Sequence, residues 1–430
     1  MANFSCAATP APEFPFVAIG IISAPTFIDR RAAIRATWLS HCSIGREIAA
    51  RFVIRALNAP PPLDRLLSSE TRDFGDIFRA LTVPFNETRL KGPVLSLHAW
   101  LRHAVGAFPR TPFVAKVDDD SYVQPAELAV LARAVSASVG PERPVYLGVF
   151  TYFSWFPTIF ERSGYGWSYG QALGARWCSN ATFVARTCGD NCGLCVGPFP
   201  FGSGFLLLLS RSLAGHLLES PGVDDDLARL RRAKTLPTRK GGVQEKVMED
   251  IWLGSALFRF PPPNPVAYVN ILGGGVTSDD WALNTLRSAL LVHIKGKVTG
   301  QVLAVHDFMQ TSDHCAQPIE LKCKSGCAAF GAKWATPPPG FCAGAQEGAS
   351  VCHLGGATPT CCTEGRKKCR LALNGRDAAP DVVERRRALT AATDQRLTAA
   401  CADAKPADCC AQIGLCEKRE RRHPWRDNEG

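Results

Sequence analysis

The sequence lacks any long uninterrupted apolar segment. Of its 430 residues, 46% are hydrophobic and 20% are charged, but no apolar run approaches the roughly 20 residues that a membrane-spanning helix requires. The longest runs, at 14–24 and 199–209, contain Gly or Pro and are predicted to be buried strands. The composition is typical of folded globular proteins and excludes wholesale disorder. The length predicts two or three domains.

A strong charge and a targeting segment are also missing. The 49 Lys and Arg outnumber the 39 Asp and Glu, which gives a modest net charge of +10. This charge fits an anionic substrate or surface and does not by itself indicate nucleic-acid binding. Residues 1–6 contain no basic stretch that leads into an apolar one, so no signal peptide is visible.

Cysteine is scarce in the first 314 residues, which hold 6, and dense in the last 116, which hold 12. Such density predicts disulfides in an oxidising compartment or a metal-binding module. Three Asn-x-Ser/Thr sequons are compatible with a secretory lumen: Asn3, Asn86 and Asn180. The missing signal peptide conflicts with a lumen, so either an N-terminal segment has been lost or the cysteines act in the cytosol. We predict an extension over 1–13, a main domain over 14–314 and a disulfide-stapled domain over 315–430.

Strands alternate with helices along the main domain, which predicts an α/β sandwich around a mostly parallel sheet. Apolar runs predict strands at 16–22, 52–54, 113–117, 145–150 and 205–209. Helical spacing predicts helices at 29–39, 125–135 and 243–258, the first capped by Asp29. Pro60-Pro-Pro62 is expected to end the unit that contains strand 52–54.

Three adjacent carboxylates, Asp118, Asp119 and Asp120, lie at the end of the predicted strand that contains Lys116. Adjacent carboxylates repel one another unless a cation or hydrogen-bond donors compensate. In open α/β sheets, ligands bind beyond the carboxyl ends of the strands. Mg²⁺ and Mn²⁺ take oxygen ligands of this kind and often share them with phosphates. The pattern fits a metal–phosphate site; a plain acidic turn is the alternative.

Two further charged groups lie at unexpected positions. Arg30, Arg31 and Arg35 occupy the early turns of a predicted helix, where the dipole favours anions, and a bound diphosphate would resolve that conflict. Solvated surface arginines are the alternative. Glu249 and Asp250 lie in an otherwise apolar helix, where partial burial would raise a carboxyl pKa toward that of a general base. An exposed helix face is the alternative.

Two histidines are candidate metal ligands. His293 and His306 each end a short apolar segment that we predict to be a strand. A single histidine is more often structural than a ligand, and the sequence alone does not choose between the two.

Six blocks of sequence, taken in order, resemble the β-1,3-glycosyltransferases of the β-1,3-galactosyltransferase type (glycosyltransferase family 31). They include Arg30-Arg-Ala-Ala-Ile-Arg-Ala-Thr-Trp38, Asp73-Phe-Gly-Asp-Ile77 and Lys116-Val-Asp-Asp-Asp120, and they span about residues 14–310. Residues 150–198 form a longer insertion than the family has, and the cysteine-rich tail lies outside the resemblance.

The resemblance implies a GT-A fold, in which a nucleotide-binding α/β half faces an acceptor half. It implies an inverting transfer of galactose or an N-acetylhexosamine from a UDP-sugar to a hydroxyl of a glycan, glycoprotein or glycolipid. The new bond would be a β-1,3 linkage, Mn²⁺ or Mg²⁺ would be required, and the location would be the Golgi lumen or membrane. An inactive, lectin-like carbohydrate-binding protein is the alternative, and the presence of Asp118, Asp120 and Asp250 argues against it.

The matched motifs also imply roles for single residues. Asp118, Asp120 and His293 would hold the metal, with Asp118 also at the nucleotide ribose and His306 as another possible ligand. Asp250 would be the general base, with Glu249 as its neighbour. The remaining donor-binding residues would be Arg31, Arg35, Lys116, Asp119 and Asp76, the last of which would read the uracil.

Overall fold

The structure is a computed structural model that describes residues 13–88, 91–153, 199–232, 249–271, 276–278, 290–294, 298–311, 320–325, 350–355 and 380–401. The strands are β1 (Val17–Ser23), β2 (Ile48–Leu57), β3 (Ile77–Pro84), β4 (Phe113–Asp118), β5 (Ser121–Val123), β6 (Val145–Phe153), β7 (Phe199–Ser210), β8 (Ala267–Asn270), β9 (Val276–Ser278), β10 (Leu291–His293), β11 (Glu320–Ser325) and β12 (Ser350–Gly355). The helices are α1 (Ile28–Arg35), the 3-10 helix η1 (Trp38–Ser40), α2 (Pro61–Phe74), α3 (Lys91–Ala107), α4 (Pro125–Val139), α7 (Arg211–Glu219), α8 (Pro221–Arg232), α9 (Glu249–Arg259), α10 (Val298–Thr311) and α13 (Pro380–Ala400).

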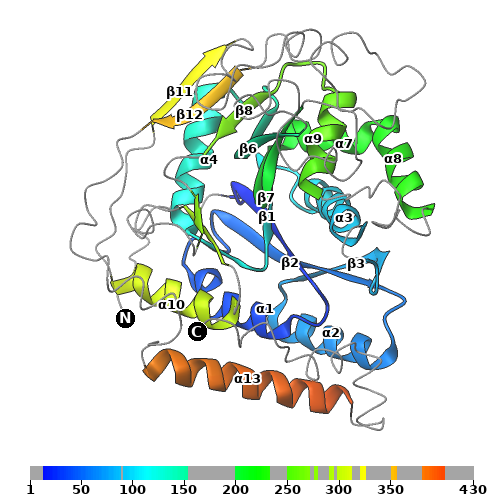
Figure 1. Ribbon diagram of the computed structural model, residues 1–430, viewed down its shortest axis with the longest axis vertical. Helices are drawn as coiled ribbons and strands as arrows, with labels where there is room; N and C mark the ends of the chain where they lie inside the picture. The colour runs from blue at the N-terminus through cyan, green and yellow to red at the C-terminus, as the bar shows by residue number, and fades with distance from the viewer. Residues whose placement is uncertain are drawn as a thin grey trace, which may run out of the picture.

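Nine of the described strands form one sheet, in the order β11-β12-β8-β6-β7-β4-β1-β2-β3. β1 pairs in parallel with β2 and β4, and β2 pairs in parallel with β3. β7 runs antiparallel to both of its neighbours, and β11 is antiparallel to β12. The expected α/β sandwich with a mostly parallel sheet is therefore confirmed (Figure 1).

Helices cover both faces of the sheet because its central strands are apolar on both sides. Val17, Ile19 and Ile21 of β1 pack in one core with α1, α2, α4 and α10, whereas Ala18 packs in the other with α3, α7, α8 and α9. The two layers are visible on either side of the sheet in Figure 1. This arrangement leaves the strand ends as the place where polar side chains can gather.

The carboxyl ends of β1 and β4 lie side by side, since Ile22 is in register with Asp118. β7 runs the opposite way, and its Leu206 is in register with Val117, so the residues just before Leu206 lie at the same edge. The predicted acids therefore lie at the edge of the sheet where ligands bind in this class of fold.

Three local predictions were wrong. Asp29 does not cap α1, because the helix begins at Ile28 and the Asp29 carboxylate accepts a hydrogen bond from Thr299 Oγ1 at 3.0 Å. α1 ends at Arg35 rather than at residue 39, and the Thr37 hydroxyl donates back to the Ala33 carbonyl at 2.8 Å where a 3-10 turn follows. Pro61 begins α2 instead of ending a unit, since proline suits the first turn of a helix.

The segment that ends at His306 was predicted to be a strand and is part of helix α10. Val302, Val305 and Met309 recur at helical spacing and are buried in the core that contains α1. A run of four apolar residues fits either type of element, and here the packing of this helix face against that core decides.

The described parts of residues 315–430 adjoin the rest of the fold. β12 pairs with β8 and so extends the main sheet, and α13 packs beside α1, α2 and α10. Cys401 in this region and Cys42 in the main domain are each disulfide-bonded. The domain boundary at residue 314 stays a prediction.

Some expectations concern other parts of the chain. Sequons Asn3 and Asn180 and nearly all of the insertion at 150–198 lie outside the described residues, whereas Asn86 is exposed after β3. Within the described ranges, no helix has both the length and the apolar character needed to cross a bilayer.

Candidate active site

The acidic turn between β4 and β5 leads into a second sheet, which has three strands in the order β5-β10-β9. β5 pairs with β10 so that Ser121 lies opposite His293, and the Ile294 N–H donates to the Asp120 carbonyl at 2.8 Å. This register brings His293 Nε2 to 3.7 Å from Asp120 Oδ1. Two of the three predicted metal ligands are thus brought together by strand pairing alone.

The donor set fits a hard or borderline divalent cation. Asp120 Oδ1 is buried and accepts no hydrogen bond, which leaves a carboxylate oxygen available beside an imidazole. The third predicted ligand, Asp118, is turned to Lys116 at 2.7 Å. No three acidic, His or Cys side chains within the described ranges already surround a cation position, so Asp118 would have to turn for all three to coordinate.

His306 lies elsewhere. Its Nδ1 is 3.2 Å from the Tyr122 hydroxyl, and its ring sits between β5 and α10. Burial lowers the pKa of His306, with Arg385 adding to the effect and Asp307 opposing it. The structure therefore places His293, and not His306, beside Asp120.

Lys116 joins three elements at the centre of the site. Its Nζ is 2.7 Å from Asp118 Oδ1 and 2.6 Å from Glu249 Oε1, and it also donates to the Gly204 carbonyl. Its side chain is only 1% exposed. Burial lowers the pKa of Lys116, but the two carboxylates raise it by more, so the amine stays charged. One buried cation thus ties β4, β7 and α9 together.

Asp250 lies beside this cation, in the first turn of α9. Its Oδ2 accepts from the Gly204 N–H at 3.2 Å and its Oδ1 from the Ile251 N–H at 2.8 Å. Burial raises the pKa of Asp250 to about 6; Glu249 adds to the rise and Lys116 opposes it. A carboxylate with this pKa is mostly ionised near neutral pH and basic enough to accept a proton.

β7 connects the base to the candidate metal position. Gly204 contacts Asp250, and the ring of the next residue, Phe205, stacks on His293 with centroids 5.2 Å apart. A Cβ on Gly204 would lie 2.6 Å from Glu249 Oε1, so a larger residue here would push the Glu249 carboxylate from its place beside Lys116. The acid–base residues and the candidate ligands therefore belong to one site.

Arg31 and Arg35 of α1 pair with acids of the protein rather than standing solvated on a surface. Arg31 is fully buried and forms a two-point ion pair with Glu70, at 2.6 and 2.9 Å. Arg35 bonds Glu70 at 2.7 Å and Asp76 at 2.7 and 2.8 Å. The expected early-turn position is wrong for Arg35, which lies in the last turn of α1, where the helix dipole favours a cation. For Arg31 the conflict with the dipole is resolved by the buried Glu70.

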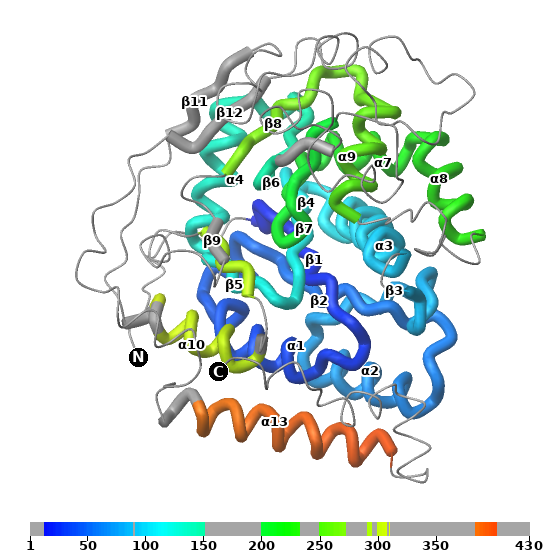
Figure 2. Tube along the Cα trace, viewed as in Figure 1, coloured from blue at the N-terminus to red at the C-terminus, as the bar shows by residue number. Residues whose placement is uncertain are grey.

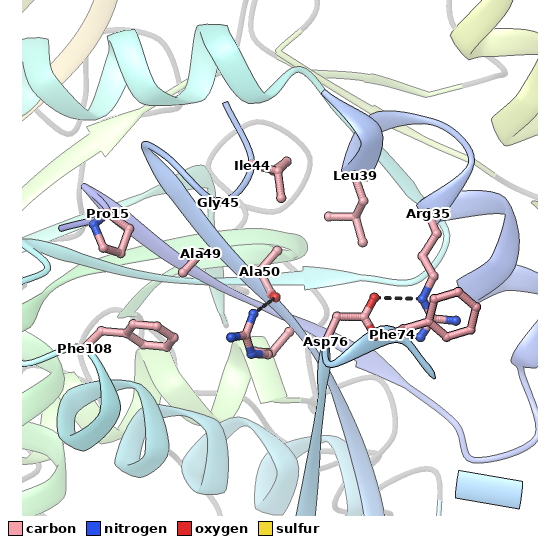
Figure 3. Close-up of a pocket in the computed structure, with 11 residues that line it drawn as sticks. Pro15, Arg35, Leu39, Ile44, Gly45, Ala49, Ala50, Phe74, Asp76 and Phe108 are labelled. Atoms are coloured by element: carbon pink, nitrogen blue, oxygen red, sulfur yellow. Dashed lines mark hydrogen bonds and ion pairs between the residues drawn. The ribbon is translucent and has the colours of Figure 1, made fainter. Parts of the chain in front are cut away.

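Arg35 and Asp76 lie at one end of a pocket of about 480 Å³ (Figure 3). Phe74 stacks on Arg35, and the floor is formed by Ala49 and Ala50 of the first half of β2. Phe108 and Pro15 line the other end. Among the residues that the structure describes, no hydrogen bond or ion pair joins the Arg35–Asp76 pair directly to the Lys116 cluster, although both were predicted to hold the donor.

Asp119 is also directed inward. Its oxygens accept from Ser23 Oγ at 2.8 Å and from Arg30 Nη1 at 2.6 Å, and the residue is 5% exposed. Arg31 donates to the same Ser23 hydroxyl at 3.3 Å. Asp119 therefore anchors the acidic turn to the loop after β1, where donors compensate its charge as the sequence required.

Sequence reasoning missed Glu70 and the structural role of Gly204. Glu70 follows Leu63, Leu66 and Leu67 at helical spacing on the buried face of α2, and all four are buried. An acid on an apolar helix face was the available signal for a buried ion pair. Nothing in the sequence indicated the contacts of Gly204, apart from its position within the span of the family resemblance.

Residues 29–148 match the family model described as Galactosyltransferase. The predicted resemblance is confirmed over this segment, which contains the arginines of α1, Lys116 and the acidic turn. Gly204, Glu249, Asp250 and His293 lie beyond the galactosyltransferase-type segment.

Curated relatives match over the same part of the chain. Hydroxyproline O-galactosyltransferase GALT2 of Arabidopsis thaliana is 32% identical over 143 residues, which is 33% of this chain and 19% of the relative. N-acetyllactosaminide beta-1,3-N-acetylglucosaminyltransferase 4 of Homo sapiens is 35% identical over 126 residues, 28% of this chain and 32% of the relative. Beta-1,3-galactosyltransferase 6 of Mus musculus is 30% identical over 138 residues, 32% of this chain and 41% of the relative. The matches thus span less than half the length of each relative.

Solved structures resemble the chain more loosely. A glycosyltransferase involved in glycosylation of the major capsid of PBCV-1 is 13% identical, with 69% of this chain and 100% of that chain covered and a TM-score of 0.30. The galactosyltransferase LgtC is 11% identical, with 66% and 89% covered and a TM-score of 0.33. Scores this low do not establish a relationship, and the fold rests on the sheet order described above.

Proposed function

We propose that this protein is a glycosyltransferase that moves galactose or an N-acetylhexosamine from a UDP-sugar to a glycan hydroxyl, with inversion, in β-1,3 linkage. The galactosyltransferase-type segment supports the reaction class. The names of the human and mouse relatives, which both specify β-1,3 transferases, support the linkage.

One observation carries the proposal. Lys116 bonds at once to Asp118 on the donor-side strand, to Glu249 beside the candidate base, and to Gly204 between them. A buried lysine with two acidic partners at the carboxyl edge of a sheet is costly to build for stability alone. It is expected where a donor and an acceptor must be held at a fixed separation.

The residues present can perform the proton step of such a transfer. The ionised Asp250 accepts the proton of the acceptor hydroxyl as that oxygen attacks the anomeric carbon of the sugar. The bond from that carbon to the UDP oxygen breaks, and its electron pair leaves with UDP. The Gly204 and Ile251 N–H groups hold the Asp250 carboxylate in place, and Lys116 holds the neighbouring Glu249 through its Oε1.

Asp120, His293 and Asp118 are the residues that would hold Mn²⁺ or Mg²⁺. When bound, such an ion neutralises the negative charge that develops on the leaving diphosphate. The disulfides at Cys42 and Cys401 support an oxidising compartment such as the secretory lumen, and the expected Golgi location is part of this proposal.

UDP release from a panel of UDP-sugars, measured with Mn²⁺ and then with EDTA, tests the proposal. We expect turnover with one sugar, lost with EDTA and in Asp120→Ala and Asp250→Asn. Asp225→Asn is the matched control, because Asp225 is an exposed acid on α8. If UDP-sugars bind without turnover, the lectin-like alternative holds; if none binds with Mn²⁺ present, the proposed function is wrong.

A further inference from the structure

Helix α13 lies beyond the region of family resemblance and yet packs along the layer behind the candidate site. In Figure 2 it runs alongside α10, α1 and α2, in orange. Leu389 and Leu397 pack against the main core, Ala400 is buried, and Arg65 of α2 donates to the Ala400 carbonyl at 3.0 Å. The helix is therefore an integral part of this layer.

One anchor of α13 is Arg396. Its Nη1 is 2.7 Å from Asp73 Oδ2, and its guanidinium lies 4.9 Å from the ring centroid of Phe74. The guanidinium of Arg35 also lies over the Phe74 ring, at 3.9 Å. Phe74 thus contacts one arginine from α13 and one from α1.

From Arg35 a continuous set of polar contacts reaches the acidic turn. Glu70 links Arg35 to Arg31, and Arg31 donates to the Ala24 carbonyl at 2.8 Å in the loop after β1. Ser23, the last residue of β1, donates to Asp119 at 2.8 Å. The first anchor thus connects with one side of the turn.

The other anchor is Arg385, which lies nearer the N-terminal end of α13. It forms an ion pair with Asp307 of α10. The neighbouring His306 lies 3.2 Å from the Tyr122 hydroxyl of β5. β5 is the strand that holds His293 opposite Ser121 and so next to Asp120. The second anchor therefore connects with the opposite side of the same turn.

We propose that α13 braces the acidic turn and that Arg385 and Arg396 are positioning residues for the candidate site. The helix fixes the loop after β1 from one end and β5 from the other, so Asp119 and Asp120 are held from both sides. Ligands held within a fraction of an ångström need such outer support. The consequence for UDP binding rests on the proposed function; the mechanical role does not.

The test uses the full-length protein with the double variant Arg385→Ala/Arg396→Ala. Arg387→Ala is the matched control, because Arg387 is an exposed arginine of the same helix. Amide hydrogen exchange is measured for peptides that cover 23–27 and 119–123, with the β4 core, 113–117, as the internal reference. UDP affinity in Mn²⁺ is measured by calorimetry.

We expect faster exchange at 23–27 and 119–123 in the double variant, with 113–117 unchanged, and UDP binding weakened about fivefold, which is within the range that two partly exposed ion pairs contribute. Unchanged exchange in the two peptides would overturn the brace. So would a uniform acceleration that includes 113–117, because α13 would then only stabilise the whole fold. If wild type binds no UDP, the proposed function fails, and the exchange data still decide the role of α13.

Discussion

Arg31 and Glu70 form a two-point ion pair in which neither side chain is exposed to solvent. The Nε–Oε1 and Nη2–Oε2 distances are 2.9 and 2.6 Å. Burial raises the pKa of Glu70, but Arg31 and Arg35 lower it by more, so the carboxylate stays ionised. This pair fixes α1 against α2 and orients Arg31 toward the loop after β1.

Glu70→Gln should destabilise the protein by about 3 kcal/mol, because it leaves the Arg31 guanidinium buried without a counter-charge. Urea unfolding at pH 7 measures the loss. The pKa of Glu70 is lowered in the folded state, so its contribution is present above the ordinary carboxyl pKa and disappears as pH falls through the lowered value. The gap between wild type and variant should therefore shrink below about pH 4.

The matched control for that variant is Glu13→Gln. Glu13 pairs with Arg110 on the surface, where the side chains are 70% and 61% exposed. An ion pair of this kind contributes little, so no measurable loss is expected. Equal losses in the two variants would contradict a special role for the buried pair.

Lys116→Met should destabilise the protein by about 3–5 kcal/mol and abolish UDP release. The variant keeps most of the length of the side chain but leaves Asp118 and Glu249 facing each other without a cation. Adding Glu249→Gln should restore part of the stability and none of the activity, as a double-mutant cycle would reveal. Arg133→Ala, which removes a half-exposed partner of Glu47, serves as the control. Independent, additive losses would rule out the coupling through Lys116.

Gly204→Ala should reduce activity at least tenfold while the protein still folds. The added Cβ would lie 2.6 Å from Glu249 Oε1 and 3.3 Å from Lys116 Nζ, so the ion pair beside the base must shift. Gly215→Ala is the control, since nothing lies within 4 Å of a Cβ there and Gly215 sits in helix α7. It should gain about 0.5–1 kcal/mol of stability with unchanged kcat. Full activity in Gly204→Ala would mean that Glu249 has room to move.

The sequence alone predicted the edge of the sheet at which the candidate site lies, because a strand pattern and a cluster of acids occur together at residues 113–120. An apolar run of strand length identified β4, and ligands collect beyond the carboxyl ends of such strands. The acids at 118–120 could thus be placed without knowing any partner. Residues whose partners lie in another element were harder, as Arg31 illustrates, because Glu70 is 39 positions away.

Local sequence patterns did not predict the type of element that contains His306 or the residue that begins α1. The apolar residues before His306 fit a strand or a helix equally well, and packing against α1 decided for the helix. Asp29 has the chemistry of an N-cap, but its carboxylate bonds Thr299 instead. In both cases a tertiary contact overrode a sound local preference.

The last prediction concerns the pH dependence of Asp250. Burial raises its pKa to about 6, with Glu249 adding to the rise. Below this value the carboxyl is protonated and cannot accept the acceptor proton, so kcat/KM should fall about tenfold per pH unit below pH 6. Asp250→Asn should lose about 10²–10⁴-fold in activity, the usual contribution of a general base.

Stability should respond in the opposite direction. Because the folded state holds this proton more tightly than the unfolded chain, the stabilising contribution is present below pH 4 and is lost as pH rises through 6. At pH 7.5 the ionised, buried Asp250 lowers the free energy of unfolding. Asp250→Asn should therefore keep or raise the Tm while activity disappears. Asp225→Asn, on the exposed face of α8, should keep the wild-type profile. If kcat/KM were constant between pH 5 and 7, Asp250 would not be the general base, and another group would accept the proton.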